Sequence, residues 1–251
     1  MGIPSISAVA NKVTSSLRER GLKGTLQKCI TEFEELRFDR RFRVDTAQAP
    51  GQSVHGAGEN HPYFPTKIAI FREIFSRLPL PYEQFTFVDL GSGKGRVLLL
   101  ASDLPFKRII GVEFSSELHE VAARNIQNYR NPARRSKEIQ SVCADATAYP
   151  LPDGHVLIFL FNPFKCSSVS RVLDNLGRSL QEQPREIYLV YNTAVCQSLM
   201  EQCGFLDVLH AGRYYSIFRS KAIGEIRGIA RNSATNASTS SYVSQPSWSD
   251  L

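Results

Sequence analysis

The sequence has no apolar run long enough to cross a membrane. The longest purely apolar stretch, VLIFLF at Val156 to Phe161, is far shorter than the roughly 20 residues of a spanning helix. The N-terminus also lacks a basic stretch followed by an apolar one, and MGIPSI has Ile6 where a myristoylation signal requires Ser or Thr. We therefore expect a soluble, cytoplasmic protein with no membrane partner.

Cysteine is sparse and irregularly spaced. The five cysteines, none at CxxC spacing, are Cys29, Cys143, Cys166, Cys196 and Cys203. An odd number at such spacings indicates neither a disulfide framework nor a zinc site, and a reducing cytosol is the simplest location. The five histidines include no HExxH motif and no His/Cys cluster, so we expect no metal.

The sequence has fewer acidic than basic residues. Lys and Arg number 30 against 24 Asp and Glu, which gives a net charge of +6 and a pI of about 9.1. The chain nevertheless lacks a dense Lys/Arg block with interleaved aromatic residues, which is typical of nucleic-acid-binding surfaces. Nucleic acid is therefore a possible partner but not a favoured one.

The composition predicts one large domain with an extension at each end. A chain of 251 residues with 42% hydrophobic content is long enough for a sizeable core. Residues 1–66 are predicted to form a helical extension that ends in a Gly-, Pro- and Asn-rich loop over Thr46 to Thr66. Residues 67–221 form the main domain, and the Ser-, Asn- and Thr-rich residues 222–251 are predicted to be disordered.

Within the main domain, strand-like and helix-like segments alternate. The expected strands are Phe85–Leu90, Arg108–Glu113, Ile139–Cys143, His155–Phe161 and Glu186–Tyr191. The expected helices are Arg96–Asp103, Ser116–Tyr129, Ser168–Gln181 and Ala194–Cys203. This alternation predicts an α/β fold with a parallel sheet covered on both faces. GFLDVLHAGRYYSIFRS breaks the rhythm and predicts an antiparallel hairpin that turns at Ala211–Gly212.

The stretch FVDLGSGKGRVLLLAS, Phe87 to Ser102, is a glycine turn between a strand and a helix, a common ligand-binding arrangement. It is not a phosphate-binding P-loop, because Val88 replaces the first glycine and Gly95 replaces the hydroxyl residue. Neither is it a dinucleotide-binding GxGxxG motif, because Arg96 stands where the third glycine belongs. These departures argue against ATP and NAD as ligands.

VDLGSGKGRVLLLA closely resembles the first motif of the class I S-adenosylmethionine-dependent methyltransferases. The resemblance extends over about Phe85 to Ser220 and implies a Rossmann-like, doubly wound, seven-stranded sheet that is mostly parallel and ends in an antiparallel hairpin. It implies S-adenosylmethionine as cofactor. The residues that it places at the cofactor in this turn are Asp89, Gly91, Ser92, Gly93 and Gly95. The alternative for Asp89 is to cap the following helix.

Two further strand ends carry the resemblance. In IIGVEFS, Glu113 is implied to accept hydrogen bonds from the ribose hydroxyls, with Phe114 beside the cofactor; the alternative for Glu113 is a solvent-facing strand end. In VCADATAYP, Asp145 is implied to face the adenine amino group, and Ala146 to leave room for the ring. The alternative for Asp145 is a turn residue.

FLFNPF is similar to the family's fourth motif and close to the Asn-Pro-Pro-aromatic signature of many N-methylating members. Asn162, Pro163 and Phe164 are the implied catalytic residues, with Asn162 also at the cofactor. The Asn162 side-chain oxygen would accept the N–H of the methyl acceptor, and Phe164 would stack on it. This chain has one proline where the signature has two, so nitrogen is the preferred acceptor and not the established one. The structural alternative is that Asn-Pro only initiates a turn, as it often does.

Two subgroups share further features with this chain. DLGSGKGR with a GVE strand resembles the seven-strand protein-lysine methyltransferases. Bacterial class I members of unassigned substrate also have elements similar to FDRRFRVDT and YFPT before the turn. This implies that Tyr63, Pro65 and Thr66 close over the methionine end of the cofactor; the alternative is a helix and loop packed on the sheet edge. Lys94 and Arg96 are expected to be solvated, because the methyl donor carries its own positive sulfonium.

The resulting hypothesis is an S-adenosylmethionine-dependent methyltransferase that modifies a nitrogen on a protein, such as a lysine, or on a small molecule. RNA or DNA methylation is the first alternative, slightly favoured by the basic pI. The second is a non-catalytic protein of this fold that retains the cofactor and acts through partners. No motif in the sequence identifies the methyl acceptor.

Overall fold

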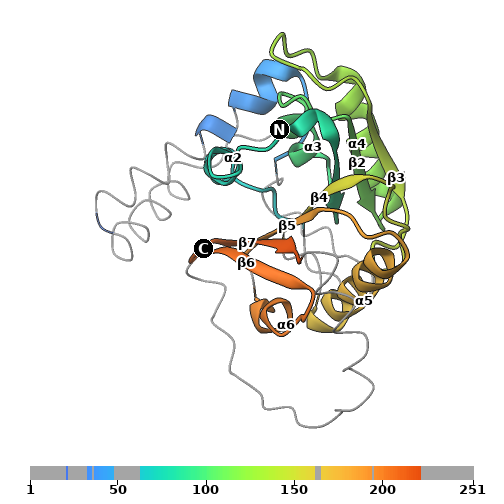
Figure 1. The fold of residues 1–251 in the computed structure, drawn as a ribbon. Helices are drawn as coiled ribbons and strands as arrows, with labels where there is room; N and C mark the ends of the chain where they lie inside the picture. Colours follow the sequence, from blue (N-terminus) through green and yellow to red (C-terminus); the bar gives the residue numbers. More distant parts are fainter. Residues whose placement is uncertain are drawn as a thin grey trace.

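The computed structural model describes residues 21, 33–35, 37–47, 63–161, 165–193 and 195–221. These residues contain a seven-stranded sheet with the strand order β3-β2-β1-β4-β5-β7-β6 (Figure 1). Neighbours in the series from β3 to β5 are parallel, whereas β7 is antiparallel to both β5 and β6. No helix in these ranges combines the length and hydropathy that a membrane span requires.

The strands are short and mostly buried. Their bounds are β1 Phe85–Leu90, β2 Arg108–Glu113, β3 Ile139–Cys143, β4 His155–Phe161, β5 Ile187–Asn192, β6 Leu206–Ala211 and β7 Tyr215–Ser220. All six residues of β1 and of β5 are buried, as expected for central strands of a sheet covered on both faces. β1 and β4 lie side by side at the centre, so the segments that follow them are neighbours at one edge.

Helices cover the two faces of the sheet in separate groups (Figure 1). The helices are α2 Ile68–Ser76, α3 Arg96–Ala101, α4 Ser116–Asn128, α5 Cys166–Glu182 and α6 Gln197–Glu201, and a 3-10 turn spans Tyr82–Gln84. One core cluster joins α2, α3 and the end of α4 to alternate strand residues such as Phe87 and Phe159. The other joins α5 and α6 to the intervening strand residues, such as Val88 and Ile158. Each strand therefore contributes to two cores, because successive side chains point to opposite faces.

The predicted fold class is confirmed. Four predicted strands have the observed bounds, and the fifth is shifted by one residue to Ile187–Asn192. The hairpin is also present, with the turn between Ala211 and Tyr215. The prediction missed α2, although IAIFREIFS shows helical spacing of its buried residues Ile68, Phe71, Ile74 and Phe75.

The expected N-terminal extension is described only in part. Residues 33–35 and 37–42 are helical, in agreement with the predicted amphipathic segment, and residues 43–47 follow without a helix or strand. We call residues 33–35 and 37–47 the N-terminal segment. Most of the predicted loop over Thr46–Thr66 and the predicted disordered tail at 222–251 lie outside the described residues. Phe38 and Phe42 of the N-terminal segment pack against Tyr129 after α4, with ring centroids 6.0 and 4.8 Å away.

Candidate active site

The glycine turn between β1 and α3 is held against the end of β2. The N–H groups of Gly91 and Ser92 donate to the carbonyl of Val112 at 2.8 and 3.1 Å. Gly91, Gly93 and Gly95 have φ angles of +86°, +52° and +81°. Because residues with side chains rarely adopt such angles, the turn requires glycine at these positions. The three glycines thus bring backbone N–H groups to the carboxyl edge of the sheet.

Glu113, the last residue of β2, joins the turn to the next helix. Its Oε2 accepts the N–H of Gly93 at 2.7 Å, and its Oε1 accepts the N–H of Ser115 at 2.9 Å. Burial raises the pKa of this carboxyl group, and the N–H donors of Ser115, Gly93 and Phe114 oppose that shift. Glu113 is only 8% exposed, so the alternative of a solvent-facing strand end is wrong. Each carboxylate oxygen retains a second acceptor position for a ligand hydroxyl.

Asp89, the fifth residue of β1, is the second buried carboxyl group at this edge. Burial, with Glu113 as the next cause, raises the pKa of Asp89 well above its ordinary value. Asp89 does not cap α3, because the residue at that position is Gly95 and no side chain caps the helix. A carboxyl group that is costly to ionise in isolation favours a ligand that brings positive charge.

A narrow recess with a volume of about 20 Å³ lies in front of Asp89. It is lined by Tyr63, Phe64, Pro65, Thr66, Asp89, Gly91, Ser92, Arg96, Val97 and Phe161. Five residues predicted to bind the cofactor therefore share one pocket: Tyr63, Thr66, Asp89, Gly91 and Ser92. The Oγ atom of Ser92 is buried and has no hydrogen-bond partner within the described ranges. This hydroxyl lies against Gly111 of β2, because a Cβ atom on that glycine would be 2.7 Å from it.

Gly93 and Gly95 are close to this pocket but do not line it. A Cβ atom on Gly93 would lie 2.3 Å from the ring of Tyr63, so this glycine permits Tyr63 to approach the turn. A Cβ atom on Gly95 would lie 3.2 Å from the Cβ of Ala122 in α4. The absence of a side chain at Gly95 therefore serves the packing of α3 on α4.

The residues predicted near the adenine lie at the ends of β2 and β3. Phe114 is 54% exposed, which leaves its ring available for stacking. Asp145 Oδ1 accepts the N–H and the hydroxyl of Thr147, both at 2.8 Å. Asp145 therefore has the turn role given as its alternative, and its other oxygen lies 3.7 Å from the guanidinium of Arg171. Ala146 is buried behind this turn.

The predicted catalytic residues Asn162, Pro163 and Phe164 lie outside the described residues. The residue before them, Phe161, ends β4 and lines the pocket together with Asp89. The chain therefore leaves the sheet at the pocket just where the Asn-Pro-Phe sequence begins.

The expectation that Lys94 and Arg96 are solvated is wrong. Their exposed fractions are 7% and 1%. The Nζ atom of Lys94 lies 2.9 Å from Asp45, and Nη1 of Arg96 lies 2.9 Å from Glu35. Both carboxylates belong to the N-terminal segment, so these cations join it to the glycine turn. The similarity over FDRRFRVDT had indicated that this segment matters. Its ion pairs with Lys94 and Arg96 could not be predicted, because local sequence patterns do not reveal contacts between residues about 50 to 60 positions apart.

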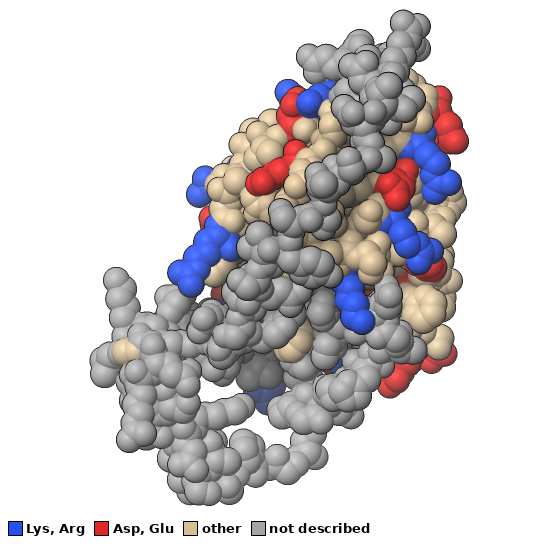
Figure 2. Space-filling model, turned by 90° about the horizontal axis from the view of Figure 1, so that it is seen from below, with Lys and Arg blue, Asp and Glu red and all other residues tan. Residues whose placement is uncertain are grey.

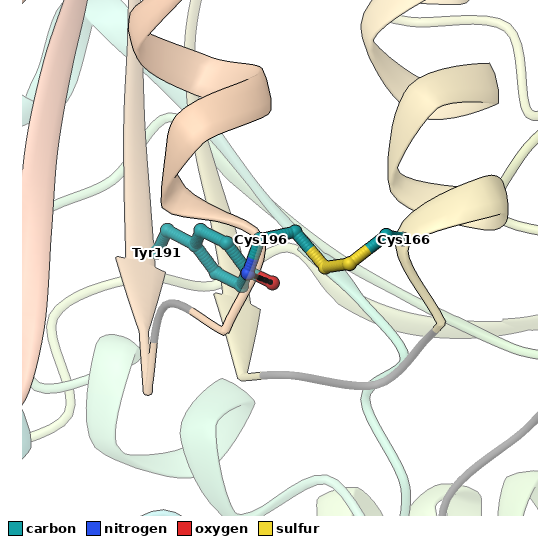
Figure 3. Close-up of a disulfide and its surroundings, with 3 residues drawn as sticks. All are labelled: Cys166, Tyr191 and Cys196. Carbon is teal, nitrogen blue, oxygen red and sulfur yellow. Dashed lines mark hydrogen bonds between the residues drawn. A yellow bond between two sulfur atoms is a disulfide. The ribbon is translucent and has the colours of Figure 1, made fainter. Parts of the chain in front are cut away.

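A disulfide joins the two helices that follow β4 and β5 (Figure 3). It links Cys166, the first residue of α5, to Cys196, directly before α6, with the Cα atoms 5.6 Å apart. The N–H of Cys196 also donates to the hydroxyl of Tyr191 on β5 at 3.4 Å. The expectation of no disulfide is wrong for this pair, because adjacent strands bring together cysteines 30 positions apart. The prediction of a reducing cytosol was based on the absence of a disulfide pattern, and the observed disulfide removes that argument.

Two other features do not contribute to the site. The described ranges contain no group of three or more His, Cys, Asp or Glu side chains that suits a metal ion. A second recess, lined by Arg108, Lys137, Glu138, Ile139 and Gln140, lies at the amino ends of β2 and β3. It is thus at the opposite edge of the sheet from Asp89 and the glycine turn.

Comparison with known proteins agrees with this geometry. Residues 87–183 match the family model described as a methyltransferase domain. The match begins in β1 and ends just after α5, so it includes the glycine turn, Glu113 and Asp145. Residues 87–183 are thus similar to a methyltransferase domain, and the sheet has the strand order of the Rossmann-like fold described above. A sequence search of curated proteins gives no match.

Similar solved structures include methyltransferases of different substrates. Magnesium protoporphyrin IX methyltransferase from Synechocystis is 12% identical, with a TM-score of 0.45 over 61% of this chain and 76% of that one. A Salinibacter ruber RNA methyltransferase is 16% identical, with a TM-score of 0.43 over 62% and 92%. A predicted N6-adenine-specific DNA methylase from Listeria monocytogenes is 12% identical, with a TM-score of 0.49 over 72% and 55%. At such distances no substrate is transferred to this chain.

Proposed function

We propose that this protein is an S-adenosylmethionine-dependent methyltransferase that modifies a nitrogen atom of a protein or a small molecule. The observation that carries the proposal is the glycine turn between two buried carboxyl groups, with the N–H of Gly93 bound to Glu113 and Asp89 in the wall of the adjacent pocket. The family match over residues 87–183 supports the reaction class.

The residues at this edge fit the parts of S-adenosylmethionine. Asp89 suits the positive charges of the methionine end. Glu113 would accept hydrogen bonds from the ribose hydroxyls through its remaining lone pairs. Phe114 would stack on the adenine, and Asp145 and Ala146 would border it. When bound, the cofactor supplies a methyl group on a positively charged sulfur.

The residues after β4 would hold the acceptor. Asn162 follows a pocket-lining residue at the centre of the sheet, and its side-chain oxygen would accept an N–H of the nucleophile. That hydrogen bond would direct the nitrogen lone pair and stabilise the positive charge that develops on it. Phe164 would provide a flat wall for the acceptor. Orientation and exclusion of water would supply most of the rate acceleration, since the leaving group is neutral.

The first test is calorimetric titration of the full chain with S-adenosylmethionine and S-adenosylhomocysteine, with NAD and ATP as controls. We expect micromolar binding of the first two only. Absence of binding to either would contradict the proposed cofactor. After binding is found, a screen with radiolabelled methyl groups over protein, RNA and small-molecule fractions identifies the acceptor class.

A matched pair of variants assigns the binding to the described edge. Glu113→Gln removes the charge that accepts hydrogen bonds at the turn, and we expect the cofactor to bind about tenfold more weakly or worse. Glu117→Gln removes an exposed charge four residues later, in the first turn of α4, and serves as the control. Equal affinities of the two variants would place the cofactor elsewhere.

A nucleic-acid acceptor is the second candidate, and one surface feature favours it. The segment from Arg130 to Lys137 carries four Lys and Arg residues, of which Arg130, Arg135 and Lys137 are exposed. On the face in Figure 2, however, positive and negative side chains are interspersed among the described residues. Binding to RNA that falls steeply with salt, and more weakly so after Arg135→Ala, would favour this candidate.

A further inference from the structure

Arg96 carries a charge that is buried without contact to any group that the proposed reaction requires. It is the first residue of α3, and its side chain is 1% exposed. Its guanidinium lies 2.9 Å from Glu35 and 3.8 Å from Asp39. These carboxylates are four positions apart in the sequence and lie beside the same guanidinium, which offsets their mutual repulsion. Burying three charges is costly, so the cluster needs a role beyond simple packing.

Asp39 and Arg96 both act on Thr46. The carboxylate of Asp39 accepts the N–H groups of Thr46 and Ala47 at 2.8 and 2.7 Å, and also the hydroxyl of Thr46. That hydroxyl accepts the Nε–H of Arg96 at 2.8 Å. Thr46 has no exposed surface, so its hydroxyl is fixed between a donor and an acceptor. The backbone at the end of the N-terminal segment is thereby held in one position.

Thr46 in turn holds Tyr63. The hydroxyl of Tyr63 donates to the backbone carbonyl of Thr46 at 2.7 Å. The Tyr63 ring lies against Gly93 so closely that a Cβ atom there would be 2.3 and 2.5 Å from two of its carbons. Because Gly93 and Arg96 belong to the same turn, the contacts form a closed circuit that runs from Arg96 through Thr46 and Tyr63 back to the turn.

A second set of bonds secures the same segment. Lys94 donates to the carboxylate of Asp45 at 2.9 Å and to the carbonyl of Ala47 at 3.1 Å. The side-chain amide of Asn125 on α4 accepts the N–H of Asp45 and donates to the carbonyls of Asp45 and Lys94, each at 2.8 Å. The position of Thr46 is therefore fixed from both sides of the turn.

We propose that Arg96 is a positioning residue that, through Thr46, holds the ring of Tyr63 as a fixed wall of the cofactor pocket. The inference rests on the proposed function, since Tyr63 and Arg96 line the pocket that contains Asp89 and Ser92. A wall that is already ordered need not be ordered when the cofactor binds, which strengthens binding. The N-terminal segment is thus part of the binding apparatus.

Two near-isosteric variants interrupt the circuit without leaving an unpaired buried charge. Thr46→Val removes the hydroxyl between Asp39 and Arg96, and Tyr63→Phe removes the hydroxyl that binds the Thr46 carbonyl. We expect each to weaken cofactor binding about fivefold, the effect of one lost hydrogen bond. KM for the cofactor rises by the same factor, whereas kcat at saturating cofactor stays within about twofold of the original value.

The double variant tests whether Thr46 acts through Tyr63. If it does, Thr46→Val adds little to the loss already caused by Tyr63→Phe, because the circuit is already open. Losses that multiply to about 25-fold would overturn the proposal. Tyr82→Phe is the control, since it removes a half-buried tyrosine hydroxyl that binds the Leu78 carbonyl away from the site. A loss of affinity in this control equal to that of Tyr63→Phe would also overturn it.

Amide hydrogen exchange separates this inference from the proposed function, because it needs no cofactor. We expect the amides of Tyr63, Phe64, Thr66 and Lys67 to exchange faster in Thr46→Val and in Arg96→Lys than in the original protein. Unchanged exchange in both variants overturns the role of Arg96. Faster exchange in a protein that binds no S-adenosylmethionine would support the circuit and contradict the proposed function alone.

Discussion

The carboxyl edge of the sheet has two halves that are built differently. In the half around β1 and β2, the glycine turn is held by hydrogen bonds and ion pairs from Glu113, Tyr63 and the N-terminal segment. In the half around β4 and β5, the helices α5 and α6 share an apolar core and are also joined by a disulfide. The first half is fixed by many polar interactions between buried groups, and the second by apolar packing and one covalent bond.

This difference matches the demands of the proposed reaction. A cofactor of constant shape is bound best by a preorganised pocket, which a dense network provides. An acceptor must enter and leave, and the exposed side chains Val195 and Tyr214 lie near the ends of β5 and β7. Variants in the two halves should therefore affect cofactor binding and turnover separately.

The largest effect is expected at Gly93. Gly93→Arg would place a Cβ atom 2.3 Å from the ring of Tyr63 at a residue whose φ is +52°, and we expect cofactor binding to be abolished. Gly154→Arg is the matched control, because Gly154 has a φ of +77° but no atom within 4 Å of its Cβ position. We expect this control to lose about 1–2 kcal/mol of stability and to bind the cofactor normally. Calorimetric titration of a folded Gly93→Arg protein that still binds would refute the assigned turn.

The next effect is expected at Asn162, in the other half. Asn162→Ala should keep the cofactor affinity and lower turnover by about 100-fold, because the acceptor nitrogen would lose its directing hydrogen bond. Single-turnover measurements at saturating cofactor give the rate of the chemical step. Undiminished turnover would remove Asn162 from the catalytic residues.

Loss of the disulfide should reduce stability without affecting the first half. Closing a loop of 30 residues contributes about 3 kcal/mol, so Cys196→Ser should lower the Tm, as should a reducing agent. Cofactor affinity should stay unchanged. Cys203→Ser is the control, because burial raises the pKa of the Cys203 thiol to about 12 and keeps it unreactive. A Tm that is identical with and without reductant would show that the bond does not form in solution.

The smallest effect is a pH dependence in the first half. Burial and Glu113 raise the pKa of Asp89 well above its ordinary value of 3.8, so this group stays protonated over a pH range in which a free Asp side chain is ionised. A cationic cofactor prefers the ionised carboxylate, and its affinity should therefore increase severalfold as the pH rises through that range. The Asp89 contribution to stability without cofactor has the opposite sign, since it is present at low pH and lost as the buried group ionises. Calorimetry should find that Asp89→Asn removes the dependence of affinity on pH.

The sequence predicted the strands and the glycine turn well because their signals are local. An apolar run such as VLIFLF and a Gly-x-Gly-x-Gly turn need no distant residue to be interpreted. The burial of Arg96 was not predictable in this way, because its partners Glu35 and Asp39 lie about 60 positions earlier. The pairing of Cys166 with Cys196 was missed for the same reason, since spacing alone does not show which strand ends are neighbours.

The sequence by itself determined the class of sheet, the position of the glycine turn and the acidic residues at the ends of β1 and β2. These follow from periodicity and from the backbone angles that only glycine adopts readily. The tertiary structure alone decided that Arg96 is buried among carboxylates, that Tyr63 lies against Gly93, and that two cysteines are bonded. Such contacts depend on the tertiary fold, which brings segments that are distant in the sequence to one edge of the sheet.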